Sequence, residues 1–434
     1  MSHNDASRRP LRAVPALAAR HLLRAVFAMP SASMQPNRSA RWARVGTEGL
    51  FAAAGGPRVS GVRRIAVLRA TPVGALVVAL PALVALRRCY PRAHIALLGS
   101  AWQREFFHRR PSPIDEVVVV PASLLDRQRS GRPWALHGDD ERAFVAAMHA
   151  RRFDVAVQLH GGGAQSNPLV RAIGARVSAG MQAPDALPLE RNLPYREWQH
   201  EALRLLETAA LVGAHAYDVE PRLAVTEADR AQAAAVLPAD DAPLLVLQPS
   251  CSDPRRAWPA ERYAAVGDHF AARGAHVVLN GTAAEAPLLA QVRAAMRAPA
   301  LDLAGALSLG GLLGLLARAR LLISNDTGTA HLARAIGTPT VTVFWIGNVA
   351  GYLPMSSARD AVVVSWRTVC PRCGRSNVDV RCEHQDSFVD EVGLAQVLAP
   401  ADELWRTPAP TADAPARGRS HAPLAGLGDA PVSS

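Results

Sequence analysis

The clearest sign of chemistry in the chain lies in the segment SNDTGTAHLARAIGTP, residues 324–339. It follows a run typical of a buried strand and is expected to form a helix, with a glycine and a proline to end it. We predict Asp326 as the N-cap of this helix, which places Thr327 and Gly328 in its first turn. Free backbone N–H groups and the helix dipole attract phosphate there. Phosphate binding is one interpretation, and a well-capped helix with a packed His331 is the other.

A second segment, LQPSCSDPRRAWPAERY at residues 247–263, ends a strand and enters a polar loop with two adjacent arginines. Arg255 and Arg256 would then stand at the carboxyl end of that strand. Because a guanidinium can bind phosphate oxygens through two parallel hydrogen bonds, the pair could clamp a diphosphate. Two solvated loop arginines are the alternative. Pro259 is expected at the first position of the helix that follows.

The first half of the chain offers two shorter loops. Ala70–Gly74 follows the first predicted strand, and HGGGAQSN, residues 160–167, follows another. Loops at the carboxyl ends of parallel strands bind ligands in such folds, and glycines let a substrate approach the backbone. Ordinary tight turns are the alternative for both loops. Neither loop has the GxGxxG pattern, so a dinucleotide-dependent dehydrogenase has no support.

Composition excludes several other activities. The 48 basic residues among 434 are all arginine, because the chain contains no lysine. A P-loop NTPase and a pyridoxal-phosphate enzyme each need a lysine and are therefore ruled out. Most of the net charge of +11 lies in residues 1–64, which hold eleven arginines against two acids. The rest of the chain is nearly neutral, so we expect no nucleic-acid partner.

Strand and helix patterns alternate along the middle of the chain, which is typical of parallel sheets covered by helices on both faces. The first series of predicted strands is Ile65–Arg69, His94–Leu98, Val117–Val120 and Asp154–Leu159. The second series is Leu244–Leu247, His276–Leu279, Leu321–Ser324 and Thr340–Phe344. We therefore predict an α/β protein with two doubly wound, Rossmann-like domains. A ligand cleft is expected between the carboxyl ends of the two sheets.

These patterns divide the chain into parts. Residues 62–228 are predicted to form the first domain and residues 242–405 the second, with a helix and a Pro/Asp-rich linker between them. Residues 1–61 are expected to be a basic, disordered arm, and residues 406–434 a disordered tail. Within the arm, Pro15–Phe27 could instead form a basic amphipathic helix that lies on the inner membrane. No apolar run could span a bilayer and the cysteine pattern is not that of a secreted protein, so we expect a cytoplasmic protein.

Three of the five cysteines cluster with a histidine late in the chain. Cys370, Cys373, Cys382 and His384 have the spacing C-x2-C-x8-C-x-H, in which the C-x2-C half is typical of a zinc knuckle. The single residue between Cys382 and His384 would strain two ligands of one tetrahedral ion. Free thiols are therefore the favoured interpretation, and a structural zinc is the alternative.

Taken together, these segments resemble the family-nine glycosyltransferases, of which the ADP-heptose:lipopolysaccharide heptosyltransferases are the best known. The resemblance spans roughly Arg64 to Leu398 and is most specific in SNDTGTAHLARAIGTPTVTVFW, residues 324–345. It implies a GT-B fold, an ADP-activated sugar donor, and inverting transfer to an acceptor of the lipopolysaccharide inner core. It implies no metal and no cofactor other than the donor itself.

The resemblance also assigns donor-binding positions. Six residues match them: Arg256, Glu285, Asp326, Thr327, Gly328 and His331. In the family, the four from Asp326 onward bind the diphosphate and the sugar. Arg256 stands where a lysine usually neutralises the leaving group, and Glu285 stands where an acid contacts the nucleoside.

The catalytic position departs from the family's pattern. The family has a Gly-Asp pair in the first loop, with the aspartate as general base on the acceptor hydroxyl, but this chain has Gly74-Ala75. Alanine cannot take a proton, so the catalytic residue is unassigned, and His160 is the nearest replacement by topology. Gln248 and Ser250 likewise stand where relatives commonly have His and Gly. The alternatives to an active transferase are an inactive relative that binds a nucleotide sugar or saccharide, and an epimerase.

Overall fold

The computed structural model describes residues 55–125, 136, 138–216, 218–355, 359–378 and 380–407. Within them, the strands form two six-stranded sheets. The helix considered for Pro15–Phe27, together with most of the predicted arm and tail, lies outside the described residues. The interpretation of those segments stays a prediction.

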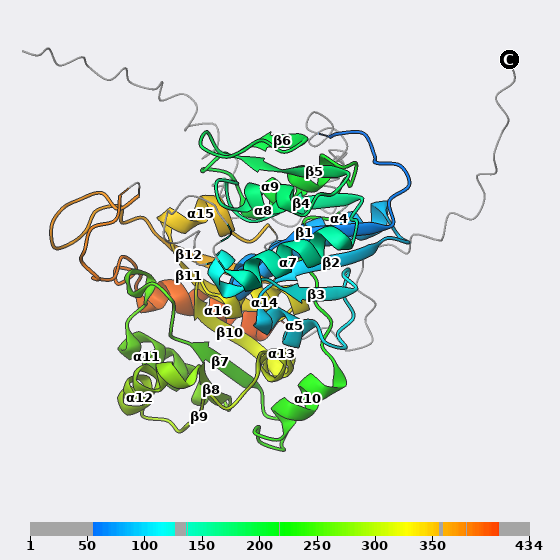
Figure 1. The fold of residues 1–434 in the computed structure, drawn as a ribbon. Helices are drawn as coiled ribbons and strands as arrows, with labels where there is room; N and C mark the ends of the chain where they lie inside the picture. Colours follow the sequence, from blue (N-terminus) through cyan, green and yellow to red (C-terminus); the bar gives the residue numbers. More distant parts are fainter. Residues whose placement is uncertain are drawn as a thin grey trace, which may run out of the picture. The chain divides into compact units, whose positions relative to one another are not determined.

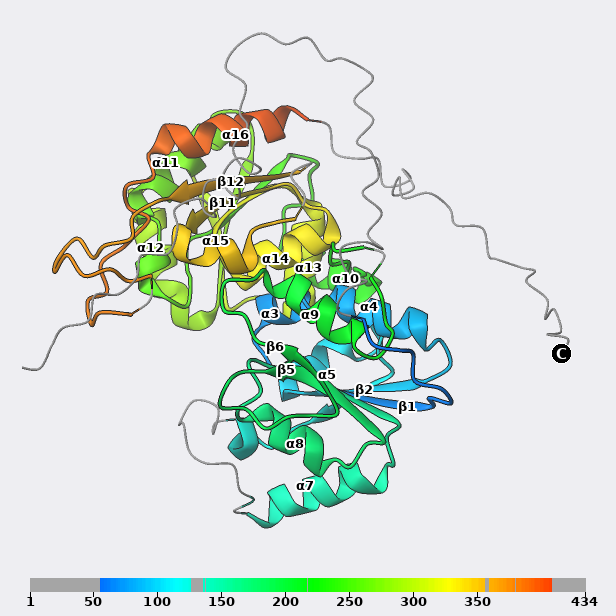
Figure 2. The same ribbon diagram turned by 90° about the horizontal axis from the view of Figure 1, so that it is seen from above.

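The first sheet is parallel throughout, in the order β3-β2-β1-β4-β5-β6. Its strands are β1 (Arg64–Leu68), β2 (His94–Gly99), β3 (Glu116–Val119), β4 (Val155–Gln158), β5 (Val177–Gln182) and β6 (Arg191–Pro194). The helices of this half are α3 (Val73–Val77), α4 (Leu80–Cys89), α5 (Ala101–Phe107), α7 (Asp139–Ala150), α8 (Ser166–Ala172) and α9 (Glu201–Ala210). Helices α4 and α9 cover one face of the sheet, and α7 and α8 cover the other (Figure 2). The central strands are apolar because both faces are buried.

The second sheet is also parallel, in the order β12-β11-β10-β7-β8-β9. Its strands are β7 (Leu244–Gln248), β8 (His276–Gly281), β9 (Ala300–Ala304), β10 (Ala319–Asn325), β11 (Thr340–Trp345) and β12 (Asp360–Ser365). Its helices are α11 (Ala260–Ala271), α12 (Ala286–Ala295), α13 (Leu309–Arg318), α14 (Gly328–Ile336), α15 (Ile346–Tyr352) and α16 (Leu394–Arg406), with short 3-10 turns η1 (Pro254–Arg256) and η2 (Ala283–Glu285). Figure 1 shows these elements as a second layered unit of the same kind.

The prediction of two doubly wound sheets is confirmed, and every predicted strand is present within two residues of its expected bounds. The patterns missed β5, β6, β9 and β12. Strand β6 (RNLP) is a partly exposed edge strand, and β9 (ALDLA) carries an acid, so neither has a continuous apolar run. Pro259 is the N-cap of α11 rather than its first residue.

The helix between the two predicted domains, α10 (Glu227–Ala234), packs on the second half. A Cβ placed on Gly314 of α13 would lie only 2.0 Å from the carbonyl oxygen of Asp229 in α10, so the two helix backbones nearly touch. The carboxylate of Asp229 also forms a buried ion pair with Arg110, which follows α5, at 2.7 Å. This pair ties the first half to the connecting helix. The division into residues 62–228 and 242–405 remains our proposal for the domains.

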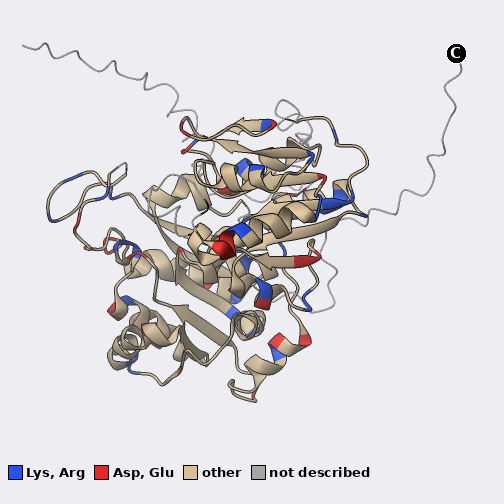
Figure 3. Cartoon of the chain, viewed as in Figure 1, with Lys and Arg blue, Asp and Glu red and all other residues tan. Residues whose placement is uncertain are grey.

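Charged residues are scattered over the helices of both halves in the view of Figure 3, with arginines and acids interspersed. A nearly neutral folded body, with the excess of arginine in residues 1–64, is consistent with this distribution. Within the described part of the chain, no helix has the length and apolar character that crossing a bilayer requires.

The contact between α10 and α13 generates a stability prediction. Gly314→Ala places a methyl group against the backbone of Asp229 and should lower the free energy of unfolding by about 1–3 kcal/mol, because the helices must separate. Gly351→Ala in α15 is the control, since a Cβ there meets nothing within 4 Å and alanine favours helix. Urea denaturation of both variants measures the difference, and equal midpoints would contradict this packing.

Candidate functional site

A cleft of about 720 Å³ opens where the carboxyl ends of the two sheets meet. Its volume is in the range of about 300–1,000 Å³ that is usual for small-molecule sites. Six residues that the sequence analysis singled out line it together: Arg256, Glu285, Asp326, Thr327, Gly328 and His331. Gly74, Ala75, Gln248 and Ser250 line it as well. The structure therefore brings both halves of the predicted site to one place.

Helix α14 presents its N-terminus to this cleft. The predicted cap was wrong by one residue, because Thr327 is the N-cap with extended backbone and Asp326 precedes it. The carboxylate of Asp326 instead contacts the guanidinium of Arg256 and the amide of Asn348. The predicted end is correct, since Gly337 terminates the helix with a φ of +84°. The backbone N–H groups of the first turn have no partner within a helix and can meet an anion.

Asp326 is the polar centre of the cleft and is only 4% exposed. Its carboxylate lies 3.2 Å from a guanidinium nitrogen of Arg256, and Asn348 donates to it at 2.6 Å. Nε2 of His331 lies 3.6 Å from its other oxygen. Burial alone would raise the pKa of Asp326, but His331, the Asn348 amide and the charge of Arg256 outweigh burial and lower it. Burial lowers the pKa of His331, although the neighbouring carboxylate of Asp326 acts in the opposite direction.

The two arginines of η1 turn out to have different roles. Arg256 lines the cleft and also donates to the main-chain oxygen of Asp326 at 3.0 Å. Arg255 is buried and forms an ion pair with Asp253 at 2.6 Å, with its guanidinium 5.7 Å from the ring centre of Trp345. The prediction of a clamp made by both arginines is therefore wrong for Arg255. Paired with Asp253 and enclosed by the fold, that side chain serves the structure of the turn.

Glu285 lies at the far end of the cleft, at the end of η2. Its carboxylate accepts the backbone N–H of Thr282 at 2.7 Å, which closes the 3-10 turn. The cleft wall beside it is apolar and is formed by Leu307, Leu309 and Leu312. An acid next to an apolar wall suits a nucleoside, whose ribose is polar and whose base is flat and hydrophobic.

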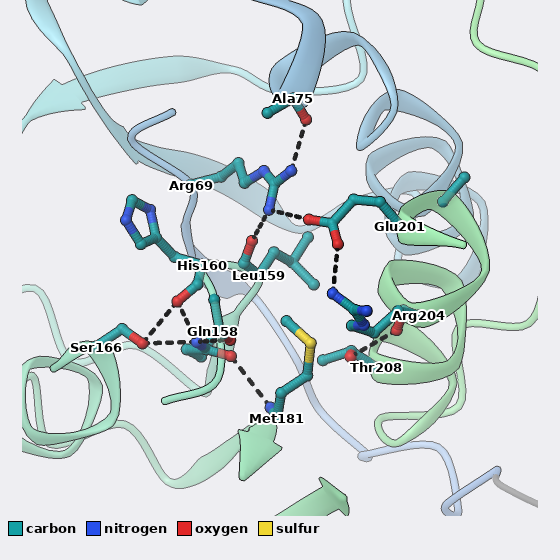
Figure 4. Close-up of polar contacts among 12 residues, drawn as sticks. Arg69, Ala75, Gln158, Leu159, His160, Ser166, Met181, Glu201, Arg204 and Thr208 are labelled. Carbon is teal, nitrogen blue, oxygen red and sulfur yellow. Dashed lines mark hydrogen bonds and ion pairs between the residues drawn. The ribbon is translucent and has the colours of Figure 1, made fainter. Parts of the chain in front are cut away.

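The backbone at Ala75, in α3, is fixed by a buried arginine that follows β1. Arg69 donates to the carbonyl oxygen of Ala75 at 2.7 Å and pairs with Glu201 of α9 at 3.0 Å (Figure 4). Glu201 in turn pairs with Arg204 at 2.7 Å. A charge buried this deeply needs such partners, and their geometry fixes the backbone at position 75. The cleft therefore keeps a rigid support at the point where the family's aspartate would stand.

His160, the replacement base that the topology suggested, is a buried residue that supports the backbone after β1. Among the described residues, it is not one of those that line the cleft. Its Nδ1 accepts the backbone N–H of Ala70 at 3.1 Å, which leaves the proton of the neutral ring on Nε2. Burial, helped by the charge of Arg69, lowers the pKa of His160 to about 4. The ring therefore supports the loop after β1, and its role as a base stays a prediction.

Two glycines set the distance between the halves of the site. A Cβ on Gly74 of α3 would lie 2.8 Å from the ring of His331, and a Cβ on Gly328 of α14 would lie 3.2 Å from Val73. Helices α3 and α14 meet at this point, between the two sheets (Figure 2). Gly328 therefore serves the approach of α3, in addition to the approach of a ligand that the sequence suggested.

The sequence analysis missed several residues of the site. Asn348 and Tyr352 reach the cleft from α15, directly after β11, where a polar residue following a buried strand was the available signal. Arg69 and Glu201 were missed because they lie far apart in sequence, although an arginine ending an apolar strand could have marked the first of them. The four residues of the cysteine cluster, Cys370, Cys373, Cys382 and His384, are not among those that line the cleft. Their sulfur atoms and one ring nitrogen of His384 lie within 4.8 Å of one another.

Two parallel Rossmann-like sheets that face one cleft, with a helix N-terminus and a buried arginine–carboxylate pair in it, define a glycosyltransferase of the GT-B type. The sequence profile of "Glycosyltransferase family 9 (heptosyltransferase)" matches residues 142–374, which is more than half of the chain. The chain belongs to this family, and the resemblance on which the sequence analysis relied is confirmed.

Relatives of known activity support this placement. The chain is 24% identical over 293 residues to lipopolysaccharide heptosyltransferase 2 of Salmonella typhimurium, covering 60% of this chain and 76% of that protein. It is 28% identical over 293 residues to lipopolysaccharide heptosyltransferase 1 of Pseudomonas aeruginosa, covering 65% of this chain and 78% of that one. The solved structure of E. coli ADP-heptose lps heptosyltransferase II superimposes with a TM-score of 0.62 and 19% identity, over 79% of this chain and 98% of that chain. The protein has the fold and the family of a glycosyltransferase.

The buried imidazole of His160 predicts a specific acid sensitivity. Its folded pKa of about 4 lies below the ordinary 6.5, so the unfolded chain binds the proton first and stability falls as the pH drops from 7 toward 4. Between pH 7 and pH 5, preferential protonation of this imidazole in the unfolded chain should lower the free energy of unfolding by about 2 kcal/mol. In His160→Asn, whose amide oxygen can still accept the Ala70 N–H, that part of the loss should disappear.

The measurement is urea denaturation at a series of pH values. His108→Asn, at an exposed histidine, is the control and should follow the wild type. A His160→Asn profile as steep as that of the wild type would show that this ring does not titrate as its burial requires.

Proposed function

We propose that the protein transfers heptose from an ADP-activated donor to an acceptor of the lipopolysaccharide-core type, with inversion and without a metal in the cleft. The observation that carries this proposal is the Arg256–Asp326 pair at the N-terminus of α14, inside the interdomain cleft of a family 9 chain. Further support comes from the relatives, which are lipopolysaccharide heptosyltransferases, one of them named for ADP-heptose.

The residues that line the cleft match the parts of the donor in one orientation. The diphosphate would lie against the first turn of α14 and the guanidinium of Arg256, because both are positive and directed into the cleft. The ribose would face Glu285, and the base would lie on the leucine wall. The sugar is then left beside Asp326 and His331, whose oxygen and nitrogen atoms can bind hydroxyl groups.

The reaction that we propose is a single displacement. An acceptor hydroxyl oxygen forms a bond to the anomeric carbon while the bond from that carbon to the diphosphate breaks, and ADP leaves with the electron pair. Arg256 and the helix N–H groups stabilise the negative charge that develops on the departing diphosphate. The hydroxyl proton must pass to a base, and Ala75 offers none.

The second candidate function follows from that gap. A relative that still binds the nucleotide sugar but no longer transfers it is favoured by one observation, Ala75 itself. The polar donor side and the buried Arg69–Glu201 support of the loop favour an active enzyme instead. A cytoplasmic location, with contact to the inner membrane through the basic arm, remains a prediction because it depends on residues outside the described ones.

The first test concerns the leaving group. Arg256→Ala should weaken ADP binding by about 10-fold or more and leave adenosine binding nearly unchanged, because it removes a phosphate contact and no nucleoside contact. Calorimetry with both ligands measures this, and Arg297→Ala, at a side chain that is 91% exposed, is the control. Equal losses for ADP and adenosine would refute the assignment of Arg256.

The second test separates the two candidate functions. Ala75→Asp places a carboxylate on α3, and turnover with ADP-heptose and a truncated lipopolysaccharide acceptor should rise by roughly 100- to 10,000-fold. The side chain of Ala75→Asn has nearly the same shape as that of Ala75→Asp but cannot take a proton at neutral pH, so this variant should gain no turnover. No turnover in the wild type and in both variants would favour the binding protein, whereas equal gains in both variants would show that shape and not basicity limits the rate.

A further inference from the structure

The four residues of the cysteine cluster form a compact shell of metal-ligand atoms. The sulfur atoms of Cys370, Cys373 and Cys382 and one ring nitrogen of His384 all lie within 4.8 Å of one another, and Cys370 Sγ is 3.7 Å from His384 Nδ1. Around a tetrahedral zinc ion, bond lengths of about 2.3 Å and about 2.0 Å place two sulfurs about 3.8 Å apart and sulfur and nitrogen about 3.6 Å apart. We propose that these four residues bind one structural zinc ion.

The backbone around the first two cysteines is a tight turn that brings their side chains together. The N–H of Gly374 donates to the carbonyl oxygen of Cys370 at 2.9 Å, and the N–H of Cys370 donates to the carbonyl oxygen of Arg375 at 2.8 Å. Gly374 has a φ of +69°, which side chains disfavour, so glycine suits this position. The turn is built independently of any contact between the two sulfurs.

Cys382, the first member of the second pair, is held by a buried asparagine. Asn377 accepts the backbone N–H of Cys382 at 3.1 Å, and its amide group donates to Cys382 Sγ at 3.4 Å. The single residue between Cys382 and His384, which argued against zinc in the sequence, does not prevent their ligand atoms from meeting. Hydrogen bonds to a ligating sulfur are the kind of outer support that metal sites use.

The chemistry of the shell favours zinc over the hard cations. Three thiolates and one imidazole are preferred ligands of zinc, whereas calcium and magnesium prefer oxygen ligands. Zinc with three thiolates carries a net charge of −1, and the nearby Arg372 is paired with Asp386 at 2.9 Å. Arg255, which pairs with Asp253, also donates to the side-chain oxygen of Asn377 at 3.1 Å and so supports the residue that contacts Cys382. Four protein ligands leave no open position, so the role is structural.

The position of the site, in the segment that connects β12 to α16, indicates what a bound zinc ion would stabilise. Residues 366–393 connect β12 to α16, and their described part has a single isolated bridge, Val369 to Ser376, as its regular structure. Loops of this length usually need a local cross-link, and this one also buries Cys370, Cys382 and Phe388 in the core of the second half. Its far end is fastened to η1, where Phe388 donates to the carbonyl oxygen of Arg255 at 2.6 Å. Zinc would hold the loop against the turn that carries Arg256.

The test uses the full-length chain purified without chelators and measures its metal content by elemental analysis. One zinc per chain is expected. Cys373→Ser removes the exposed ligand and should lower zinc affinity by more than about 100-fold, whereas Cys89→Ser, at a cysteine remote from the cluster in sequence, should retain the metal. Replacement of zinc by cobalt in the wild type should produce the visible absorption of a tetrahedral thiolate site, which does not depend on the folding of any variant.

Three results would overturn the proposal. They are a chain purified free of zinc that does not take up zinc or cobalt, a Cys373→Ser variant that binds zinc as tightly as the wild type, and a cobalt spectrum without thiolate bands. None of them bears on ADP binding, so failure here is distinguishable from failure of the proposed function.

Discussion

The buried carboxylate of Asp326 is the constraint on which the rest of the site depends. An ionised acid that is 4% exposed must be compensated, and its partners come from three different elements: Arg256 from η1, His331 from α14 and Asn348 from α15. Each of these elements follows the carboxyl end of a different strand. The requirement to neutralise one charge therefore fixes the relative positions of the loops that form the donor side of the cleft.

The acceptor side is organised by a second buried charge. Arg69 follows β1, donates to the carbonyl oxygen of Ala75 in α3 and pairs with Glu201 of α9, so one guanidinium joins these two helices. The two sides meet where Gly74 and Gly328 allow α3 and α14 to approach. Ala75 lies within this framework, at the position that the resemblance assigns to the catalytic aspartate.

The sequence predicted the fold well because buried parallel strands have the simplest of patterns, a short apolar run such as LLVL at residues 244–247. Edge strands such as β6 and β9 lack that pattern and were missed. Donor-side positions were found because they lie in contiguous motifs. Arg255 was misassigned since two neighbouring arginines are equivalent in sequence, and only packing against Asp253 and Trp345 separates them.

Other features depend on contacts between distant residues, which no local pattern reveals. The Arg69–Glu201 pair joins residues 132 positions apart, and the environment of His160 is set by a backbone N–H at Ala70. The cysteine cluster shows the opposite case. Its spacing was visible at once, and in the folded loop the ligand atoms of all four residues lie within 4.8 Å of one another, although a single residue separates Cys382 from His384. Free thiols, the interpretation that the sequence favoured, and a zinc site both stay predictions.

The use of arginine at the phosphate end of the cleft has a chemical consequence. A guanidinium keeps its proton at any pH at which a protein stays folded, whereas an amine in the same place would begin to lose its charge in alkaline solution. The chain also lacks lysine altogether, so acetylation of lysine side chains, which cells use to remove positive charge, has no target among its 434 residues. The cation beside Asp326 is in this sense permanent: neither alkali nor lysine acylation can switch it off.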